Sequence, residues 1–198
     1  FWQCFVDLQP VRLGLNPEEV EGVNTQSSLK TEEDIRDYKA FFKRLVELNE
    51  QSTQPLSIRE INVCMNHILL DKKHDHTQMN VPMAILSFDC DGNISTFAPE
   101  LLTTTHPVYD NFIFGNVFEG TLEEMSAHPK LLEVNDHIQQ GVARCKDTCS
   151  YFAFCGGGSP SNKLHENGTF DSSETTACRL KIKVTTDVLL EHLEEKYY

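Results

Sequence analysis

The chain has 198 residues and a net charge of −13, which is long enough to bury a sizeable core as one large domain or two small ones. Its 17 Lys and Arg residues against 30 Asp and Glu argue against nucleic acid or an anionic membrane as a main partner, because a phosphate-binding face needs clustered positive charge. No apolar run is long enough for a transmembrane helix, so we expect no membrane partner.

The N-terminal part is predicted to mix extended segments with helices. Residues 1–6 resemble the middle of a strand, and since the chain starts there without Met we expect it to be a piece of something longer. A helix is predicted from about residue 30 to 50, where Thr31 and Asp34 form a capping box. Its apolar face is expected to consist of Ile35, Tyr38, Phe41, Leu45 and Leu48.

Residues 56–61 look like a strand, and residues 63–70 look like an apolar helix. An alternation of strand and helix is typical of an α/β layer or of part of a barrel. The segment is too short to close a barrel.

After residue 80 the pattern changes to strands and turns. Residues 83–89 and 94–97 are apolar or alternating, and the turn residues 91–93 separate them. This arrangement predicts a β-hairpin.

Helical patterns follow the hairpin. Thr121 with Glu124 three residues later predicts a capped helix start, and helix is expected to continue after Pro129 and to deliver Cys145 at its end. Residues 186–198 are predicted to form a closing amphipathic helix.

Seven cysteines are an odd number, which fits a disulfide framework poorly. A cytosolic metal site beside three ordinary thiols, Cys4, Cys64 and Cys90, fits more easily. We therefore expect a cytoplasmic protein.

Four cysteines have the spacing C-x3-C-x5-C, then 22 residues, then a last cysteine: they are Cys145, Cys149, Cys155 and Cys178. Four thiolates complete a [4Fe–4S] cube or a tetrahedral zinc site. The glycine run 156–158 lets backbone N–H groups approach a bulky cluster, and zinc usually takes tighter C-x2-C pairs. The spacing favours iron–sulfur, and leaves zinc and disulfides or free thiols open.

Around these cysteines the sequence reads CxxxCxYFxxCGGGxPxNK, followed by ENGTF and CR. This stretch resembles the SPASM-type region of radical SAM peptide maturases, most closely the branch that matures glycine-rich-repeat precursors and forms cyclophanes. The resemblance covers nearly the whole chain. It implies an α/β fold in which residues 1–80 are the second half of a partial (β/α) radical SAM barrel, 81–184 an auxiliary-cluster domain with a β-hairpin and helices, and 185–198 a C-terminal helix.

Two departures from the family pattern are informative. The family has a G-x4-C motif, and counting from Gly92 this chain has Phe97 in place of the cysteine. The family also has a C-x3-C motif, and counting from Cys155 this chain has Ser159 in place of the second cysteine. Both positions serve the same cluster in the family. The resemblance therefore implies that one auxiliary cluster is lost and that the other is retained on the four cysteines, with Cys90 an ordinary thiol at a strand end.

The core motif C-x3-C-x2-C, which holds the cluster that cleaves S-adenosylmethionine, is absent from these 198 residues. The chain alone is therefore expected to be inactive, while its parent would bind S-adenosylmethionine and a core [4Fe–4S] cluster. By resemblance, the parent joins carbon atoms in a ribosomally made precursor peptide, for which a basic composition would suit the acidic chain.

The same resemblance places Glu19 and Glu21 near the barrel mouth as candidate contacts of S-adenosylmethionine, although a solvated loop explains them equally well. The segment His74-Asp75-His76 resembles a metal chelate but is expected to be a solvated loop. The alternative for the whole chain is a non-catalytic structural zinc or iron–sulfur module that binds a peptide partner.

Overall fold

The computed structural model describes residues 2–197, and their contacts divide them into two units. The first unit comprises the described parts of 1–18, 27–73 and 176–198, and the second comprises 19–26 and 74–175. These are contact units, and the predicted domain ranges remain an expectation.

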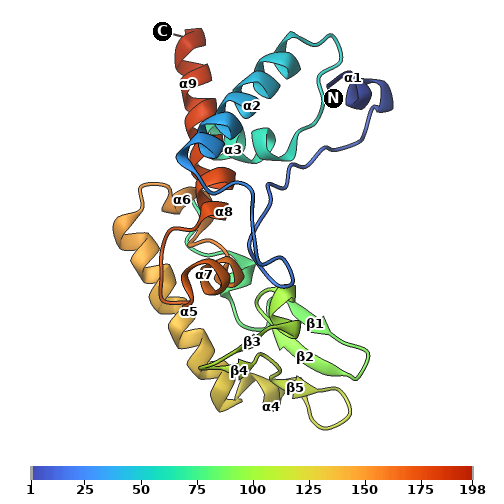
Figure 1. The fold of residues 1–198 in the computed structure, drawn as a ribbon, viewed down its shortest axis with the longest axis vertical. Coiled ribbons are helices and arrows are strands. Elements are labelled where there is room, and N and C mark those ends of the chain that lie inside the picture. Colours follow the sequence, from blue (N-terminus) through green and yellow to red (C-terminus); the bar gives the residue numbers. More distant parts are fainter. Residues whose placement is uncertain (1, 198) are drawn as a thin grey trace. The chain divides into compact units, whose positions relative to one another are not determined.

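The first unit is helical (Figure 1). Its C-terminal helix packs against the two longer helices before it. Fully buried side chains such as Phe42, Ile58 and Leu189 fill its core. Its helices are α1 (Trp2–Leu8), α2 (Glu32–Gln51), α3 (Arg59–Leu70), α8 (Thr176–Cys178), the π-helix η3 (Arg179–Val184) and α9 (Thr185–Tyr197).

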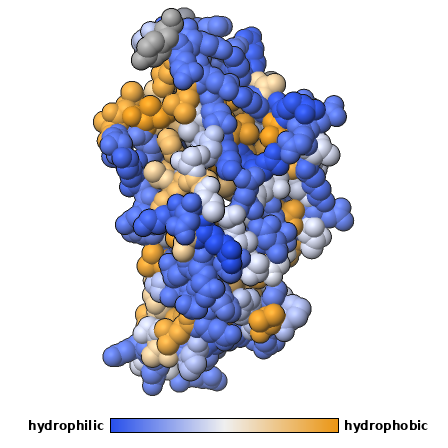
Figure 2. All heavy atoms as spheres, turned by 90° about the vertical axis from the view of Figure 1, so that its left-hand side faces the viewer, coloured by the Kyte–Doolittle hydropathy of each residue, from blue (hydrophilic) through white to orange (hydrophobic). Residues whose placement is uncertain are grey.

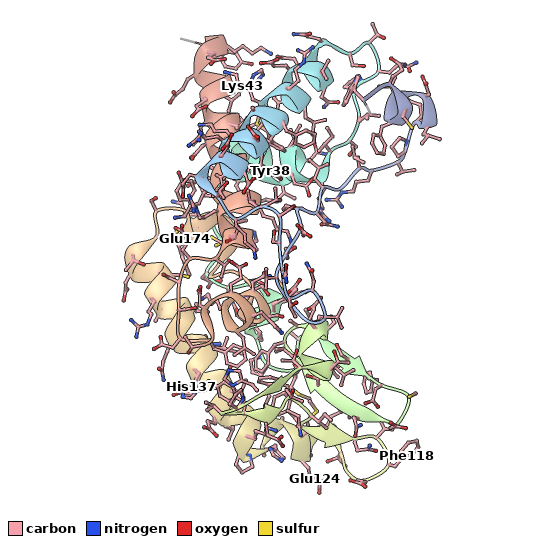
Figure 3. The ribbon with its side chains drawn as sticks, in the orientation of Figure 1. Tyr38, Lys43, Phe118, Glu124, His137 and Glu174 are labelled. Atoms are coloured by element: carbon pink, nitrogen blue, oxygen red, sulfur yellow. The ribbon has the colours of Figure 1, made fainter. Side chains whose placement is uncertain are left out.

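The capped helix predicted at residues 30–50 is confirmed as α2. Thr31 and Asp34 form both bonds of the capping box. Lys43, which Figure 3 labels beside α9, pairs with Glu195 at 2.8 Å. Burial is the main cause that raises the pKa of Tyr38 on this helix to about 12.

Two predicted strands of this unit are wrong. Residues 2–8 form helix α1, in which Trp2, Phe5 and Val6 share one side at helical spacing. Residues 56–61 supply only a single parallel bridge, from Ile58 to Leu13, in which the N–H of Arg59 donates to the Leu13 carbonyl at 2.8 Å. Helix α3 begins at Arg59, directly after this bridge.

The second unit combines helices with short strands. The predicted hairpin is confirmed, with Leu86 opposite Thr96 and Phe88 opposite Ile94. A third short strand pairs with its second strand to give the order β1-β2-β5, and β3 pairs with β4. The elements are η1 (Gln78–Asn80), β1 (Leu86–Phe88), β2 (Asn93–Thr96), η2 (Pro99–Thr103), β3 (Thr105–His106), β4 (Asp110–Asn111), β5 (Gly115–Asn116), α4 (Leu122–Ser126), α5 (Pro129–Thr148), α6 (Phe152–Cys155) and α7 (Pro160–Asn167).

One apolar core joins the hairpin region to α5 and α7. Aromatic rings dominate it, with the rings of Phe112 and Phe170 edge to face at 5.6 Å. Its aliphatic part comes from one side of α5 through Leu131, Val134 and Ile138. This core fixes α5, which carries the first cysteine of the motif.

The surface is largely polar. Figure 2 shows a face on which hydrophilic side chains predominate and hydrophobic ones form separate patches. None of the helices among residues 2–197 is both long and apolar enough to cross a membrane.

Candidate metal centre

Three of the four motif cysteines are brought together where α5 ends. Cys145 lies in the last turn of α5 and is buried. Cys149 caps that helix and donates its N–H to the Cys145 carbonyl at 2.9 Å, and Cys155 ends the short helix α6. The end of α5, the turn 149–152 and α6 thus carry these three cysteines in succession.

The pKa of the Cys155 thiol is raised above its ordinary value. Burial raises the pKa of its thiol, and negative charge on Cys145 or Cys149 raises it further. The N–H groups of Gly157 and Gly158 lower the same pKa, because they donate to the sulfur. The Cys155 thiol thus lies in a buried site with two backbone donors from the glycine loop.

Two glycines of the run 156–158 are closely approached by neighbouring atoms. Gly156 has φ +63°, and a Cβ there would lie 2.5 Å from the backbone of His76. Gly157 has φ +102°, and its Cβ would lie 3.1 Å from the methyl groups of Val142. A loop with bare backbone N–H groups is suited to the sulfides of an iron–sulfur cluster, which accept such hydrogen bonds.

The segment 74–80 forms one wall of this glycine loop, which the sequence did not indicate. The N–H of His74 donates to the Ala153 carbonyl at 2.8 Å, and the buried Asn80 donates its amide to the Gly156 carbonyl at 3.2 Å. The Asp75 and His76 side chains are largely exposed, as expected for a solvated loop, but their backbone packs on the cysteine loop. Asn80 stands at the end of a polar stretch, and nothing in the residue pattern distinguishes it.

Cys178 ends α8 in the first unit and is half-buried, so its role as fourth ligand stays a prediction. Within residues 2–197 no three His, Cys, Asp or Glu side chains are gathered at metal-binding distances as they stand. None of the seven cysteines, all of which lie within residues 2–197, forms a disulfide bond. The chemistry of the donors nevertheless fits a thiolate-bound group, since the Cys145 Sγ lies 3.8 Å from the Gly157 carbonyl and the N–H groups of Gly157 and Gly158 donate to the Cys155 sulfur.

The two positions that depart from the family pattern have other roles. Phe97 is fully buried in the apolar core of the second unit. Ser159 is the N-cap of α7, where its hydroxyl accepts the N–H of Asn162 at 3.5 Å. Cys90 is exposed at the hairpin turn.

Helix α7, which follows the cysteine loop, holds the segment that contains Glu19 and Glu21. The amide of Asn162 donates to the Glu19 carboxylate at 2.9 Å and to the Glu21 carboxylate at 3.2 Å. The ring of His165 donates from Nδ1 to the Ser161 carbonyl at 2.8 Å, so its Nε2 accepts the N–H of Gly22 at 3.2 Å. The two predicted cofactor contacts thus lie side by side, and the sequence missed His165 because its partner Gly22 is more than a hundred residues away in the chain.

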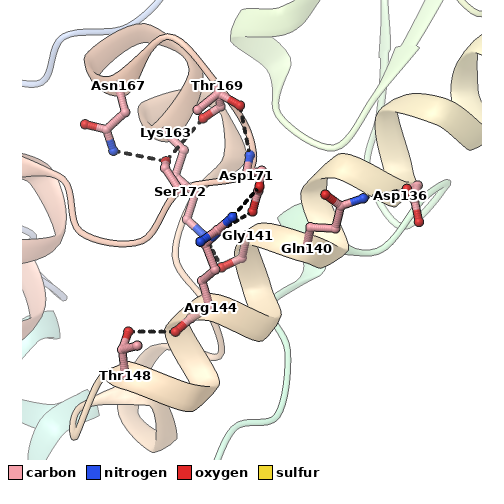
Figure 4. Close-up of polar contacts among 10 residues, drawn as sticks. All are labelled: Asp136, Gln140, Gly141, Arg144, Thr148, Lys163, Asn167, Thr169, Asp171 and Ser172. Carbon is pink, nitrogen blue, oxygen red and sulfur yellow. Dashed lines mark hydrogen bonds and ion pairs between the residues drawn. The ribbon is translucent and has the colours of Figure 1, made fainter.

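A hydrogen bond joins α7 to α5, and an ion pair joins the loop after α7 to α5 (Figure 4). Lys163 is buried, and its ammonium donates to the Gly141 carbonyl at 2.9 Å. Arg144 forms a two-point ion pair with Asp171, one bond of which is 2.8 Å long. The hydrogen bond from Arg144 is the main cause that lowers the pKa of Asp171 below its ordinary value of 3.8.

The Asp171 pair predicts a dependence of stability on acid. A carboxylate whose pKa is depressed by folding contributes stability above its unfolded pKa, and loses it as the pH falls through the lower folded value. The thermal midpoint of the wild-type chain is therefore expected to exceed that of Asp171→Asn at neutral pH, and the difference should shrink as the pH falls below 3.8. Thermal unfolding by circular dichroism over this range measures it, and in an Arg144→Gln background the difference should be small at every pH.

Comparisons with known proteins bear on the fold. No protein-family model matches the chain. The "Uncharacterized protein sll1766" of Synechocystis sp. (strain ATCC 27184 / PCC 6803 / Kazusa) is 42% identical over 191 residues, which are 96% of this chain and 48% of that protein. The chain thus spans about half the length of the curated relative that it matches.

Solved structures share the fold. "Native anSMEcpe with bound AdoMet" matches 98% of this chain and 52% of its own with a TM-score of 0.62 at 18% identity. "Native anSMEcpe with bound AdoMet and Kp18Cys peptide" matches the same shares with a TM-score of 0.58 at 19% identity. The chain therefore has the mixed helix-and-sheet fold of about half of anSMEcpe.

Proposed function

We propose that this chain is part of a radical SAM maturase that modifies a precursor peptide by carbon–carbon crosslinking, and that it binds one auxiliary [4Fe–4S] cluster through Cys145, Cys149, Cys155 and Cys178. In this proposal residues 1–80 belong to the barrel, 81–184 to the SPASM-type domain and 185–198 to the closing helix. The proposal places the protein in the reducing cytoplasm, where thiols stay available as metal ligands.

The observation that carries the proposal is the arrangement at the end of α5. The buried Cys145 thiol lies 3.8 Å from the Gly157 carbonyl, and the N–H groups of Gly157 and Gly158 in the same loop donate to the Cys155 sulfur. Such donors matter for an iron–sulfur cluster, because its potential depends on hydrogen bonds to its sulfurs.

The solved neighbours support the same class. anSMEcpe is a radical SAM maturase of the SPASM type, and its structures hold AdoMet and, in one of them, a peptide. A shared fold at 18% identity leaves substrate and reaction open. The motif resemblance is what suggests the crosslinking reaction and a basic, ribosomally made substrate.

A bound cluster of this kind supplies one-electron transfer, which a crosslinking reaction needs when the new bond is formed and one electron must leave. The chain's own residues would hold it and set its surroundings. The thiolates bind iron, the N–H groups of Gly157 and Gly158 donate to sulfur, and the buried Cys145 keeps one side away from water. Glu19 and Glu21, both held by Asn162, offer carboxylates to the cationic groups of S-adenosylmethionine.

Replacing Cys155 by alanine is expected to abolish cluster incorporation. After anaerobic reconstitution with ferrous iron and sulfide, the wild-type chain should contain about four irons and the Cys155→Ala variant less than about one, because a cubane with three ligands is exposed to loss. Cys90→Ala is the matched control, since Cys90 lies on the hairpin turn and should leave the iron content unchanged. Equal iron in the Cys155→Ala variant and the wild type would exclude this cysteine as a ligand.

The alternative is a non-catalytic structural module with zinc or an iron–sulfur cluster that binds a peptide partner. The absence of C-x3-C-x2-C from the sequence favours it for the chain by itself. The same reconstitution separates the two metals, because a zinc module would bind about one zinc and remain colourless.

A further inference from the structure

The second unit contains a long stretch without positive side chains. Between Lys73 and Lys130 there is no Lys or Arg, while eight acidic residues occur. These are Asp75, Asp89, Asp91, Glu100, Asp110, Glu119, Glu123 and Glu124. Such one-sided charge produces a negative potential that attracts cationic partners.

A pocket lies within this acidic stretch, between the edge strand β5 and helix α4. Its volume is about 410 Å³, and Gly115, Asn116, Glu119, Glu124 and His128 are among the residues that line it. The carboxylate of Glu124 accepts the N–H of Thr121 at 2.8 Å, and this bond is the first cause that lowers its pKa. It therefore stays ionised and contributes a fixed negative charge to the pocket.

Exposed apolar residues are the neighbours in the chain of residues that line this pocket. Phe118 is 83% exposed, and Val117 and Leu122 are about half exposed. Phe118 and Val117 lie over the hairpin turn, since a Cβ on Gly92 would be 2.7 Å from either side chain. Figure 3 shows Phe118 and Glu124 at the same end of the second unit. Exposed aromatic rings beside carboxylates are suited to a partner that carries both positive and apolar groups.

We infer that the β5–α4 pocket and its apolar border bind a basic peptide segment, with an Arg or Lys side chain directed towards Glu119 and Glu124 and an apolar neighbour packed on Phe118. A nucleic acid or an anionic lipid surface is disfavoured by the same charges. This peptide site does not depend on the cysteine loop, so its failure and the failure of the cluster proposal are distinguishable.

The probe for the test is a fluorescein-labelled synthetic peptide in which Arg and Phe alternate with Gly. Its control is the same peptide with Glu in place of every Arg. Fluorescence anisotropy with the 198-residue chain measures both dissociation constants. The basic peptide is expected to bind at least about tenfold more tightly than the acidic one, with weaker binding as salt is raised.

Charge reversal then locates the site. Glu119→Lys is expected to weaken binding of the basic peptide about tenfold, and Phe118→Ser about fivefold. Glu194→Lys makes the same charge change at an exposed position of α9 in the first unit and should alter binding less than about twofold. Hydrogen exchange of residues 113–125 should slow when the basic peptide is bound.

Two results would overturn the inference. One is equal binding of the basic and acidic peptides, or no binding of either. The other is an equal loss of affinity in Glu119→Lys and Glu194→Lys, which would assign the binding to net charge alone. If Glu119→Lys fails to fold, Glu119→Gln replaces it, with an expected weakening of about threefold.

Discussion

Replacing Gly141 by alanine is expected to lower the thermal midpoint of the chain by about 6–12 °C, which corresponds to about 3 kcal/mol. A Cβ at this position in α5 would lie 2.1 Å from the carbonyl oxygen of Phe170 and 3.1 Å from that of Ser172. Both are backbone atoms of the loop after α7, and the ion pair of Arg144 with Asp171 joins this loop to α5. Since this pair holds the loop against α5, we expect the clash to cost stability.

Thermal unfolding followed by circular dichroism measures this effect. Gly120→Ala is the control, because the nearest atom to its Cβ would be the flexible Glu124 carboxylate at 3.1 Å. A change in midpoint that is no larger for Gly141→Ala than for Gly120→Ala would show that the close approach of the loop to α5 is wrong.

Replacing Phe97 by alanine is expected to destabilise the chain by about 3–5 kcal/mol, because a fully buried ring leaves a cavity in the core of the second unit. Urea unfolding measures the loss. A cost below about 1 kcal/mol would contradict the packing of this side chain.

The backbone at Phe97 adds a sharper test. Its φ is +77°, a region that glycine adopts freely and that costs other residues about 1–2 kcal/mol. Phe97→Gly removes the same ring as Phe97→Ala but relieves this strain. We therefore expect the glycine variant to be about 1 kcal/mol more stable than the alanine variant, the reverse of the order in an ordinary strand.

Local signals in the sequence were reliable where the partners are near in the chain. The capping boxes at Thr31 and Thr121 are confirmed because each joins residues three positions apart. The hairpin is confirmed because a turn joins two adjacent apolar runs. On α2 the predicted apolar face is right at Ile35 and Leu45 but not at Phe41, which is 40% exposed.

Extended segments were harder to predict, because a strand needs a neighbour that the pattern does not name. Residues 2–8 are as apolar as a buried strand, yet they form a helix. Residues 56–58 form only one isolated β-bridge, at Ile58, before α3 begins.

The candidate site divides in the same way. The spacing of Cys145, Cys149 and Cys155 could be read from the sequence, since one helix end and one turn carry all three. The roles of Asn80 and His165 could not be read from the sequence, because their partners are distant in the chain. Asn80 bonds to Gly156, and His165 bonds to Gly22. The sequence shows that Phe97 stands where the family pattern has a cysteine ligand. Its burial in the apolar core could be seen only in the folded structure.

The iron and acid-labile sulfide content of the anaerobically reconstituted wild-type chain tests the central claim most directly, together with its visible spectrum and its electron paramagnetic resonance after reduction by dithionite. One cluster on four cysteines predicts about four irons and about four sulfides per chain, a broad brown absorption, and a signal from one reduced cubane. About one zinc per chain with no colour, or iron enough for two clusters, would contradict it.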